Sequence, residues 1–345
     1  MAVTYVPNTY RGTYFSEIFK DILYRNNTLR RKMVRFMTDI KLQETLTSVG
    51  GTVVIQAYTP NRPAPAGSIN FGDALIRPQK ALVYDEYNPD AIFRQTRFAE
   101  TLSAGVQNIV SEEGNRMILE VVIDQTAQAQ DIMFWSHMGA TTKAAVALAG
   151  NAALTTAPEK TLASAMPTNT SDIDGVVAKL IMQTLTPGGA PEAVPTILVS
   201  GVPLTAINIG AELTKVHQAI PQVLKYGQDS TRATNDLRIF ADYSVRDLIN
   251  YSNFGQQYRE NLIPISGENY SFLGVQMEFV PMPNPNIMIA GNSQELIWGT
   301  DVSGDFTGSL EVGKKEAFSH IEGYRLDFSQ TAAVVAAQRK VLYIA

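Results

Sequence analysis

Two overlapping stretches near the C-terminal end have spacings that resemble known binding loops. GSLEVGKK, Gly308 to Lys315, nearly matches the phosphate-binding loop G-x-x-x-x-G-K-[ST]. Lys315 stands where that loop needs a hydroxyl to hold magnesium, and Glu311 would bring a negative charge towards the phosphates. The sequence therefore argues against a nucleotide site here.

The overlapping stretch DVSGDFTGSLEV, Asp301 to Val312, could offer oxygen ligands to calcium. An EF-hand loop needs glycine at its sixth position and a bidentate glutamate at its twelfth, where this chain has Phe306 and Val312. Apolar residues alternate with polar ones along the stretch, which predicts a half-buried strand.

Other arrangements of reactive residues are equally sparse. His137, His217 and His320 are far apart, the chain has no cysteine, and H-E-x-x-H, G-x-S-x-G and G-x-G-x-x-G do not occur. We therefore predict no catalytic, cofactor-binding or metal-binding residue. A Ser-His-Asp triad assembled from distant positions stays open, because such groups need only be neighbours in space.

Composition indicates a soluble chain with a basic beginning. Its 345 residues are 45% hydrophobic and 18% charged, enough for a substantial core and about two domains. Neither a signal peptide nor a run of about 18 apolar residues occurs, so we expect no membrane partner. Eight of the 28 basic residues but only three of the 33 acidic ones precede residue 42. A basic arm is therefore expected ahead of an acidic body.

The elements that would carry this arm begin with a helical pattern. From Phe15 to Met37 apolar residues recur every three or four positions, which predicts one amphipathic helix or two short ones. The polar face would carry a basic cluster, as either a solvated surface or a nucleic-acid contact. The cluster consists of Arg30, Arg31, Lys32 and Arg35.

A long hairpin is predicted next. Gly51–Thr59 and Arg77–Glu86 have strand character, and the residues between them are rich in proline and glycine. Such a hairpin is marginally stable alone, so it must lie on something else. The candidate contact residues at its tip are Pro60, Arg62, Pro63, Pro65, Phe71 and Asp73.

A rod helix is predicted from Thr101 to Trp135, with a break near Gly114 left open. Gly139–Thr170 is Ala/Thr-rich and weakly patterned, which we interpret as a connector between domains. The rod would be the longest single element of the chain, about 52 Å.

Strand and helix patterns then alternate, which is typical of an α/β or α+β region. We expect a helix at Asp172–Leu185, a strand at Thr196–Ser200 and a helix at Pro203–His217. Gln218–Ile265 mixes tyrosines with charges of both signs, so it suits either a protein contact or a plain solvated surface.

The stretch FLGVQMEFVPMPNPNIMIAGNSQELIWGTD closes this region. Phe272–Val280 and Ile287–Ile289 are expected to pair as strands, with the prolines at 281, 283 and 285 forming a turn between them. Ile297 and Trp298 would anchor a return strand.

This order of parts is similar to that of the major capsid proteins of tailed bacteriophages, which have the HK97-type fold. The resemblance implies an α+β fold with an N-terminal arm, an extended loop, a peripheral domain with a spine helix, and an axial domain. The end of the chain adds a run of valine, alanine, basic and tyrosine residues that is similar to the family's last segment. That run is Val334, Val335, Ala336, Ala337, Arg339, Val341 and Tyr343.

The resemblance also implies domain boundaries. The arm would cover 1–45, the extended loop 46–88 and the peripheral domain 89–170. The axial domain would cover 171–283, and strands returning to the peripheral domain would cover 284–345.

The function implied by the resemblance is structural and not enzymatic. Subunits would form the pentamers and hexamers of an icosahedral virion shell, assembled in the host cytoplasm around double-stranded DNA. Implied partners are other copies of the chain and portal, separate scaffolding and decoration proteins. The basic cluster would face DNA phosphates or a neighbouring subunit, and no crosslink is assigned to Lys80.

Two other hypotheses stay open at this point. An encapsulin-like shell would enclose protein cargo instead of DNA. A soluble α/β enzyme with a dispersed active site would form a monomer or a small oligomer.

Overall fold

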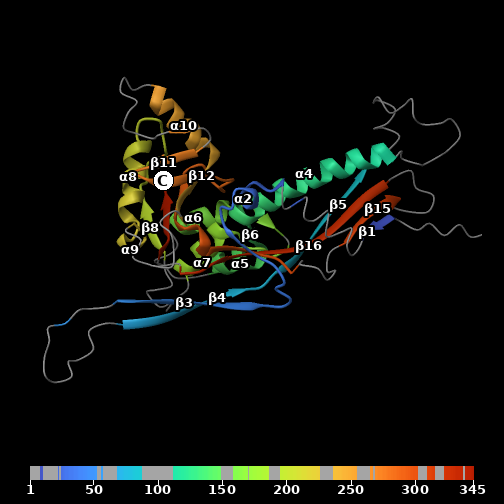
Figure 1. Ribbon diagram of the computed structural model, residues 1–345, viewed down its shortest axis with the longest axis horizontal. Coiled ribbons are helices and arrows are strands. Elements are labelled where there is room, and N and C mark those ends of the chain that lie inside the picture. The colour runs from blue at the N-terminus through green and yellow to red at the C-terminus, as the bar shows by residue number, and fades with distance from the viewer. Residues whose placement is uncertain are drawn as a thin grey trace, which may run out of the picture.

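The computed structural model of the chain contains two main β-sheets, joined by a long helix and extended by a projecting hairpin (Figure 1). The residues that it describes are 8–10, 22, 25–52, 56, 68–87, 112–148, 158–169, 171–185, 195–225, 236–254, 265–266, 269–301, 309–314, 322–336 and 339–345.

The larger sheet mixes parallel and antiparallel pairs and lies at the left of Figure 1. Its seven strands are, in order across the sheet, β10 (Ile265–Ser266), β11 (Asn269–Phe272), β12 (Val275–Phe279), β9 (Leu237–Ala241), β13 (Ile287–Asn292), β17 (Val341–Ile344) and β8 (Thr196–Val199).

The smaller sheet is built around one long strand, β16 (Glu322–Val334), with which strands from both ends of the chain pair. The other strands are β1 (Asn8–Tyr10), β15 (Ser309–Lys314), β14 (Leu296–Gly299), β2 (Arg35–Met37) and β5 (Gln79–Tyr87).

Helices cover both sheets, and a short parallel pair, β6 (Met138–Gly139) with β7 (Thr168–Asn169), lies among them. The helices in the described ranges are α2 (Asn27–Arg30), α4 (Glu112–Ser136), α5 (Ala140–Leu148), α6 (Pro158–Ala165), α7 (Val176–Leu185), α8 (Ile209–Ala219), α9 (Gln222–Lys225) and α10 (Tyr243–Phe254).

Strand β13 shows why the larger sheet is so apolar. Every residue of β13 is buried, and its side chains alternate between two cores. Ile287 and Ile289 join the core that contains α7, whereas Met288 and Ala290 join the core that contains α8 and α10. A strand covered on both faces has no solvent side, so its sequence is a continuous apolar run.

Helix α4 connects the two sheets. Its middle packs on β16 through Ala127, and its end carries two aromatic rings into the larger core. Phe134 stacks on Trp298 with 4.5 Å between ring centroids, and Trp135 lies 4.9 Å from Phe240. The rod helix predicted from the sequence is thus confirmed over its described part, where it runs through Gly114 without a break.

The one helix or two short ones expected from Phe15 to Met37 are confirmed at α2 but wrong beyond Arg30. Helix α2 ends at Arg30, Lys32 has a φ of 52°, and Arg35–Met37 form strand β2, while nearly all of the first half lies outside the described residues. Strand β2 pairs with β14, whose Trp298 is buried, so tertiary pairing overrides the local helical spacing.

The connector expected at Gly139–Thr170 is also wrong, because it contains helices α5 and α6. Alanine is the best helix former, so an Ala-rich stretch needs little patterning to become helical. Two carboxylates hold the start of α5: Asp172 accepts from the Thr141 N–H at 2.8 Å, and Asp174 accepts from the Gly139 N–H at 3.0 Å.

These carboxylates also explain why the next helix begins late. Helix α7 begins at Val176, four residues after the expected start at Asp172, because the intervening residues cap α5. Helix α8 begins at Ile209 and not at Pro203. The strand expected at Thr196–Ser200 is confirmed as β8.

The strands expected to pair at Phe272–Val280 and Ile287–Ile289 are not neighbours, because β9 lies between β12 and β13. Strand β9 lies within Gln218–Ile265, a range whose composition suggested a polar surface. Arg238 interrupts the apolar run of β9, so the sequence pattern did not indicate a strand there. The turn expected around the three prolines is confirmed, since the Ile287 N–H donates to the Asn284 carbonyl at 3.2 Å.

Candidate functional site: the basic segment and the hairpin

The basic cluster does not form one helix face. Arg30 ends helix α2, Arg31 caps it, Lys32 occupies a left-handed turn, and Arg35 lies on strand β2. Arg30, Lys32 and Arg35 are exposed, whereas Arg31 is only half-exposed. The four basic residues therefore do not share the expected helix face. Three are exposed on different elements, and Arg31 is partly buried against the protein.

Arg31 is held by a buried carboxylate of its own chain. Its Nη1 lies 3.7 Å from Oε2 of Glu278 on β12, whose Oε1 lies 3.2 Å from Nη1 of Arg238 on β9. Burial raises the pKa of the Glu278 carboxyl, and the two guanidinium groups oppose that rise. Arg31 thus attaches the N-terminal segment to the larger sheet. The sequence alone did not indicate that Glu278 is its ion-pair partner.

Residues 25–37, here called the strap, are also fastened to helix α4. The Trp135 Nε1–H donates to Thr28 Oγ1 at 2.8 Å, and that hydroxyl donates to the Asp131 carboxylate. The Asn26 side-chain amide donates to the Ala127 carbonyl at 3.3 Å. Burial raises the pKa of Asp131 to about 6, while the hydrogen bonds from Thr28 lower it.

Further contacts make the strap a bridge between elements that are distant in sequence. The Asn27 amide donates to the Tyr243 hydroxyl of α10 at 3.1 Å, and Arg25 forms an exposed ion pair with Asp124 of α4 at 2.7 Å. Burial and the charge of Asp131 raise the pKa of the Tyr243 phenol. The strap therefore ties helix α4 to both the larger sheet and helix α10.

The hairpin has different strands from those expected. Strand β3 (Glu44–Thr52) pairs with β4 (Ser68–Ile76), which we had assigned to the tip, and the expected second strand is β5, which returns to β16. Both hairpin strands therefore lie earlier in the sequence than predicted, because β5 pairs with β16 of the smaller sheet and not with β3.

The predicted tip residues fall into two groups. Phe71 and Asp73 lie within β4, paired with Val49 and Thr47, so they are not at the tip. Pro60, Arg62, Pro63 and Pro65 lie outside the described residues.

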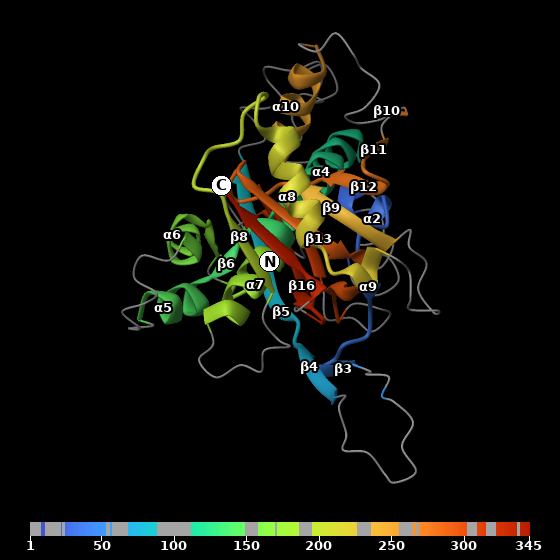
Figure 2. The same cartoon turned by 90° about the vertical axis from the view of Figure 1, so that its left-hand side faces the viewer.

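The base of the hairpin joins a hydrophobic core. Ile76 is fully buried against Ile40 and Ile297, with Leu46 partly buried beside them. Leu75 is 54% exposed, and the two strands project from the body in both views (Figures 1 and 2). The hairpin is thus anchored at its base, and the apolar side chain of Leu75 stays more than half exposed.

Strand β15 bears on both binding-loop hypotheses. Ser309–Lys314 is strand β15, which agrees with the strand expected at Asp301–Val312 from Ser309 onwards and not with a phosphate loop, while residues 302–308 lie outside the described residues. Among the described residues no three His, Asp or Glu side chains are grouped to hold a metal ion.

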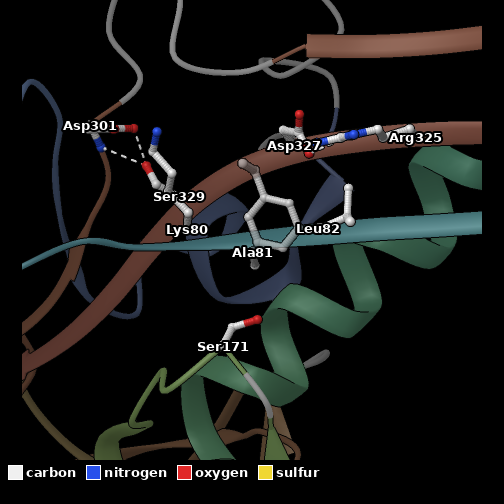
Figure 3. A pocket seen from close by; sticks show the side chains of 9 residues that line it. Lys80, Ala81, Leu82, Ser171, Asp301, Arg325, Asp327 and Ser329 are labelled. Atoms are coloured by element: carbon white, nitrogen blue, oxygen red, sulfur yellow. Dashed lines mark hydrogen bonds and ion pairs between the residues drawn. The ribbon is translucent and has the colours of Figure 1, made fainter.

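A hollow of about 410 Å³ lies on the outer face of the smaller sheet (Figure 3). Lys80 points towards Asp301 and Ser329, where the serine hydroxyl donates to the carboxylate, and Arg325 pairs with Asp327 at 3.2 Å. Its charges are of both signs and largely engaged with each other, which suits a protein contact better than a charged small molecule.

Comparison with known proteins gives a match at the level of structure. No family model and no curated protein matches the sequence. Solved structures do, and the three described here are capsid structures. A chain of the cyanophage A-1(L) capsid asymmetric unit matches with a TM-score of 0.53 and 11% identity, covering 99% of this chain and 95% of that one.

Two further structures agree. A chain of the satellite phage P4 procapsid, solved with its size determination protein, matches with a TM-score of 0.52, 8% identity and coverage of 96% and 98%. The capsid of an empty GTA particle, computed with C5 symmetry, gives 0.52, 8% and coverage of 93% and 89%. The chain therefore has the α+β, HK97-like capsid fold, as its order of elements predicted.

Proposed function

We propose that the chain is the major capsid protein of a tailed-phage-type virion, a non-catalytic subunit that forms pentamers and hexamers around double-stranded DNA. The observation that carries the proposal is the projecting hairpin β3–β4, whose base joins a hydrophobic core of its own chain while Leu75 on β4 is 54% exposed. A two-stranded hairpin is marginally stable alone, so a neighbouring subunit would supply the missing contact. The capsid-like fold supports the same conclusion.

The proposed domain organisation follows the expected boundaries. Residues 1–45 would be the arm, 46–88 the extended loop and 89–170 the peripheral domain, with 171–283 forming the axial domain and 284–345 returning to the peripheral domain. In support, β14 and β16 from the last range belong to the smaller sheet beside α4. Strands β13 and β17 of the same range lie in the larger sheet, so the return passes through both.

The exposed cations of the strap would face the packaged genome. Arg30, Lys32 and Arg35 are accessible, and such side chains bind phosphates without selecting a base sequence. Arg31 is excluded from this role because Glu278 holds it.

Replacing the three cations together by alanine tests this role. DNA retention in purified particles should fall and lose part of its salt dependence, while Arg31→Ala should act on subunit stability instead. If the triple variant retains DNA normally but assembles poorly, the cations contact a neighbouring subunit and not the genome.

Other partners follow from the proposal. A portal, a separate scaffolding protein and a decoration protein would join the shell, which would assemble in the host cytoplasm and remain in the virion. No helix within the described part of the chain is both long and apolar enough to cross a membrane.

The decisive experiment identifies the contents of the particle. The chain is expressed with its neighbouring genes, particles are treated with nuclease, and their protein and nucleic acid are measured. Protected DNA supports a viral shell, whereas protein cargo without DNA identifies an encapsulin-like compartment. A persistently small species with measurable hydrolase or transferase activity would favour a soluble enzyme instead.

A further inference from the structure

The larger sheet carries exposed apolar side chains at one edge, around strand β8 and the loop that follows it. Val199 is 51% exposed, Val202 53% and Ile207 97%. We call these three residues the β8 patch. A single exposed apolar side chain is ordinary, but three within nine residues form a surface that water solvates poorly.

The loop that presents this patch is firmly held. The Ser200 N–H donates to the Ile344 carbonyl at 3.0 Å, and the Leu204 N–H donates to Asn286 Oδ1 at 3.1 Å. Asn208 Oδ1 accepts from the Thr205 N–H at 2.7 Å. The β8 patch is therefore a preformed surface, and a partner would not have to order it first.

A second group lies towards the opposite edge of the sheet, on helix α10 and the β11–β12 turn. Tyr251 is 68% exposed and Leu273 61%. We call these the α10 patch. Helix α10 lies over this edge, where the Tyr270 hydroxyl of β11 donates to Asn250 of α10 at 3.5 Å.

Leu273 is an unusual residue for its position. Leu273 has a φ of 49° and Gly274 a φ of 83°, a pair of positive angles that two-residue hairpin turns normally fill with Asn-Gly. A leucine there costs about 1 kcal/mol in backbone strain, and its side chain stays 61% exposed within the chain. Neither folding nor solubility favours it, which points to a contact made outside the subunit.

We propose that the β8 patch of one subunit packs against the α10 patch of the next copy, head to tail around a ring. The two patches flank opposite edges of one sheet, β8 at one and β10–β11 at the other, so they cannot meet within a subunit. A head-to-tail contact needs two different surfaces on one chain, and its repetition closes a ring. This inference rests on the proposed shell function.

The chain has no cysteine, so engineered thiols report the contact without interference. Assembled particles of the Ile207→Cys, Leu273→Cys double variant are treated with a short bis-maleimide and separated on denaturing gels. The expected result is a ladder of covalent oligomers that ends at five and six subunits. Each single variant should stay monomeric, as should the control pair Ile207→Cys, Gln218→Cys, whose second site is an exposed residue of α8 outside both patches.

Three results would overturn the contact. Intact particles without a ladder would show that the patches do not meet, and dimers from Ile207→Cys alone would show that like patches meet each other. Absence of particles from the unmodified chain would contradict the shell function itself, and the ring contact with it.

A substitution that favours the fold gives an independent test. Leu273→Asn suits the positive φ, so the melting temperature of the subunit should stay the same or rise. Association of subunits should weaken about tenfold, as expected when one leucine side chain is no longer buried. Normal assembly by this variant would also overturn the proposal.

Discussion

Asp131 is the residue at which pH acts on the strap. Its carboxylate is buried beside Thr28, and burial raises its pKa from 3.8 to about 6. Because the folded state holds this proton more tightly than the unfolded state, stability falls as pH rises from 3.8 to about 6 and is level above that range. The buried charge then costs at most about 3 kcal/mol.

Asp131→Asn should remove this part of the pH dependence. The amide can still accept from Thr28, so the variant should match the parent near pH 4 and melt at a higher temperature near pH 7.5. Thermal melts at both pH values test the expectation. Asp124→Asn, an exposed site on the same helix, is the control and should keep the parent slope; an unchanged slope in Asp131→Asn would refute the assignment.

Glu278 is expected to dominate the strap's attachment to the larger sheet. Glu278→Ala removes the partner of Arg238, whose side chain is only 13% exposed, and of Arg31. Leaving a buried guanidinium unpaired should lower the free energy of unfolding by about 3 kcal/mol, measured by urea denaturation. Arg25→Ala breaks the exposed pair with Asp124 and should cost less than 1 kcal/mol. Equal effects of the two changes would contradict this account.

At the scale of elements, Gly175 sets how closely helix α7 approaches α4. A Cβ at this position would lie 2.7 Å from the Phe134 carbonyl oxygen and 2.8 Å from that of Met133. Backbone atoms cannot move aside as a flexible side chain can, so the two helices must separate. Gly175→Ala should therefore destabilise the subunit by about 1 to 3 kcal/mol. An unchanged melting temperature would show that the approach is looser than described.

The hairpin should matter to assembly and not to subunit folding. Joining Thr47 to Asp73, which face each other in the ladder, through an Asn-Gly turn keeps the base with Leu46 and Ile76 and removes the projecting part. We expect a folded subunit with an almost unchanged melting temperature that forms no particles. Particles of normal size from this variant would show that the hairpin is dispensable for assembly.

The spacing of apolar residues correctly predicted those elements whose local pattern agrees with their packing in the fold. Helix α4, strand β8 and the proline-marked turn were found because each has a local pattern that packing leaves unchanged. Strand β9 was missed because Arg238 interrupts its apolar run, and that charge is tolerated only because Glu278 lies beside it on β12. The partner of a charge is a property of the fold, which no local window contains.

The candidate site was also predicted only in part, because its contacts join residues that are distant in the sequence. The basic cluster was predicted by composition, but its division into exposed cations and a buried Arg31 depends on a contact with β12. The strands of the hairpin were misassigned because β5 is drawn to β16, a strand more than two hundred residues away along the chain.

At the scale of the whole molecule, the subunit consists of a body held together by internal contacts and of segments that extend from that body. Helix α4 and the strap bind the two sheets together, so the body can act as a rigid unit. The hairpin and the edges of the larger sheet extend beyond it with apolar residues exposed. This division is what a subunit needs if its remaining stability comes from neighbours in a closed shell.

The most direct test of this account is the size and shape of the purified chain, expressed with and without its neighbouring genes, by light scattering and negative-stain electron microscopy. We predict closed particles or tubes built from rings of five and six subunits in at least one of the two preparations. A single small species in both, with no particle or tube at any protein concentration tested, would contradict it.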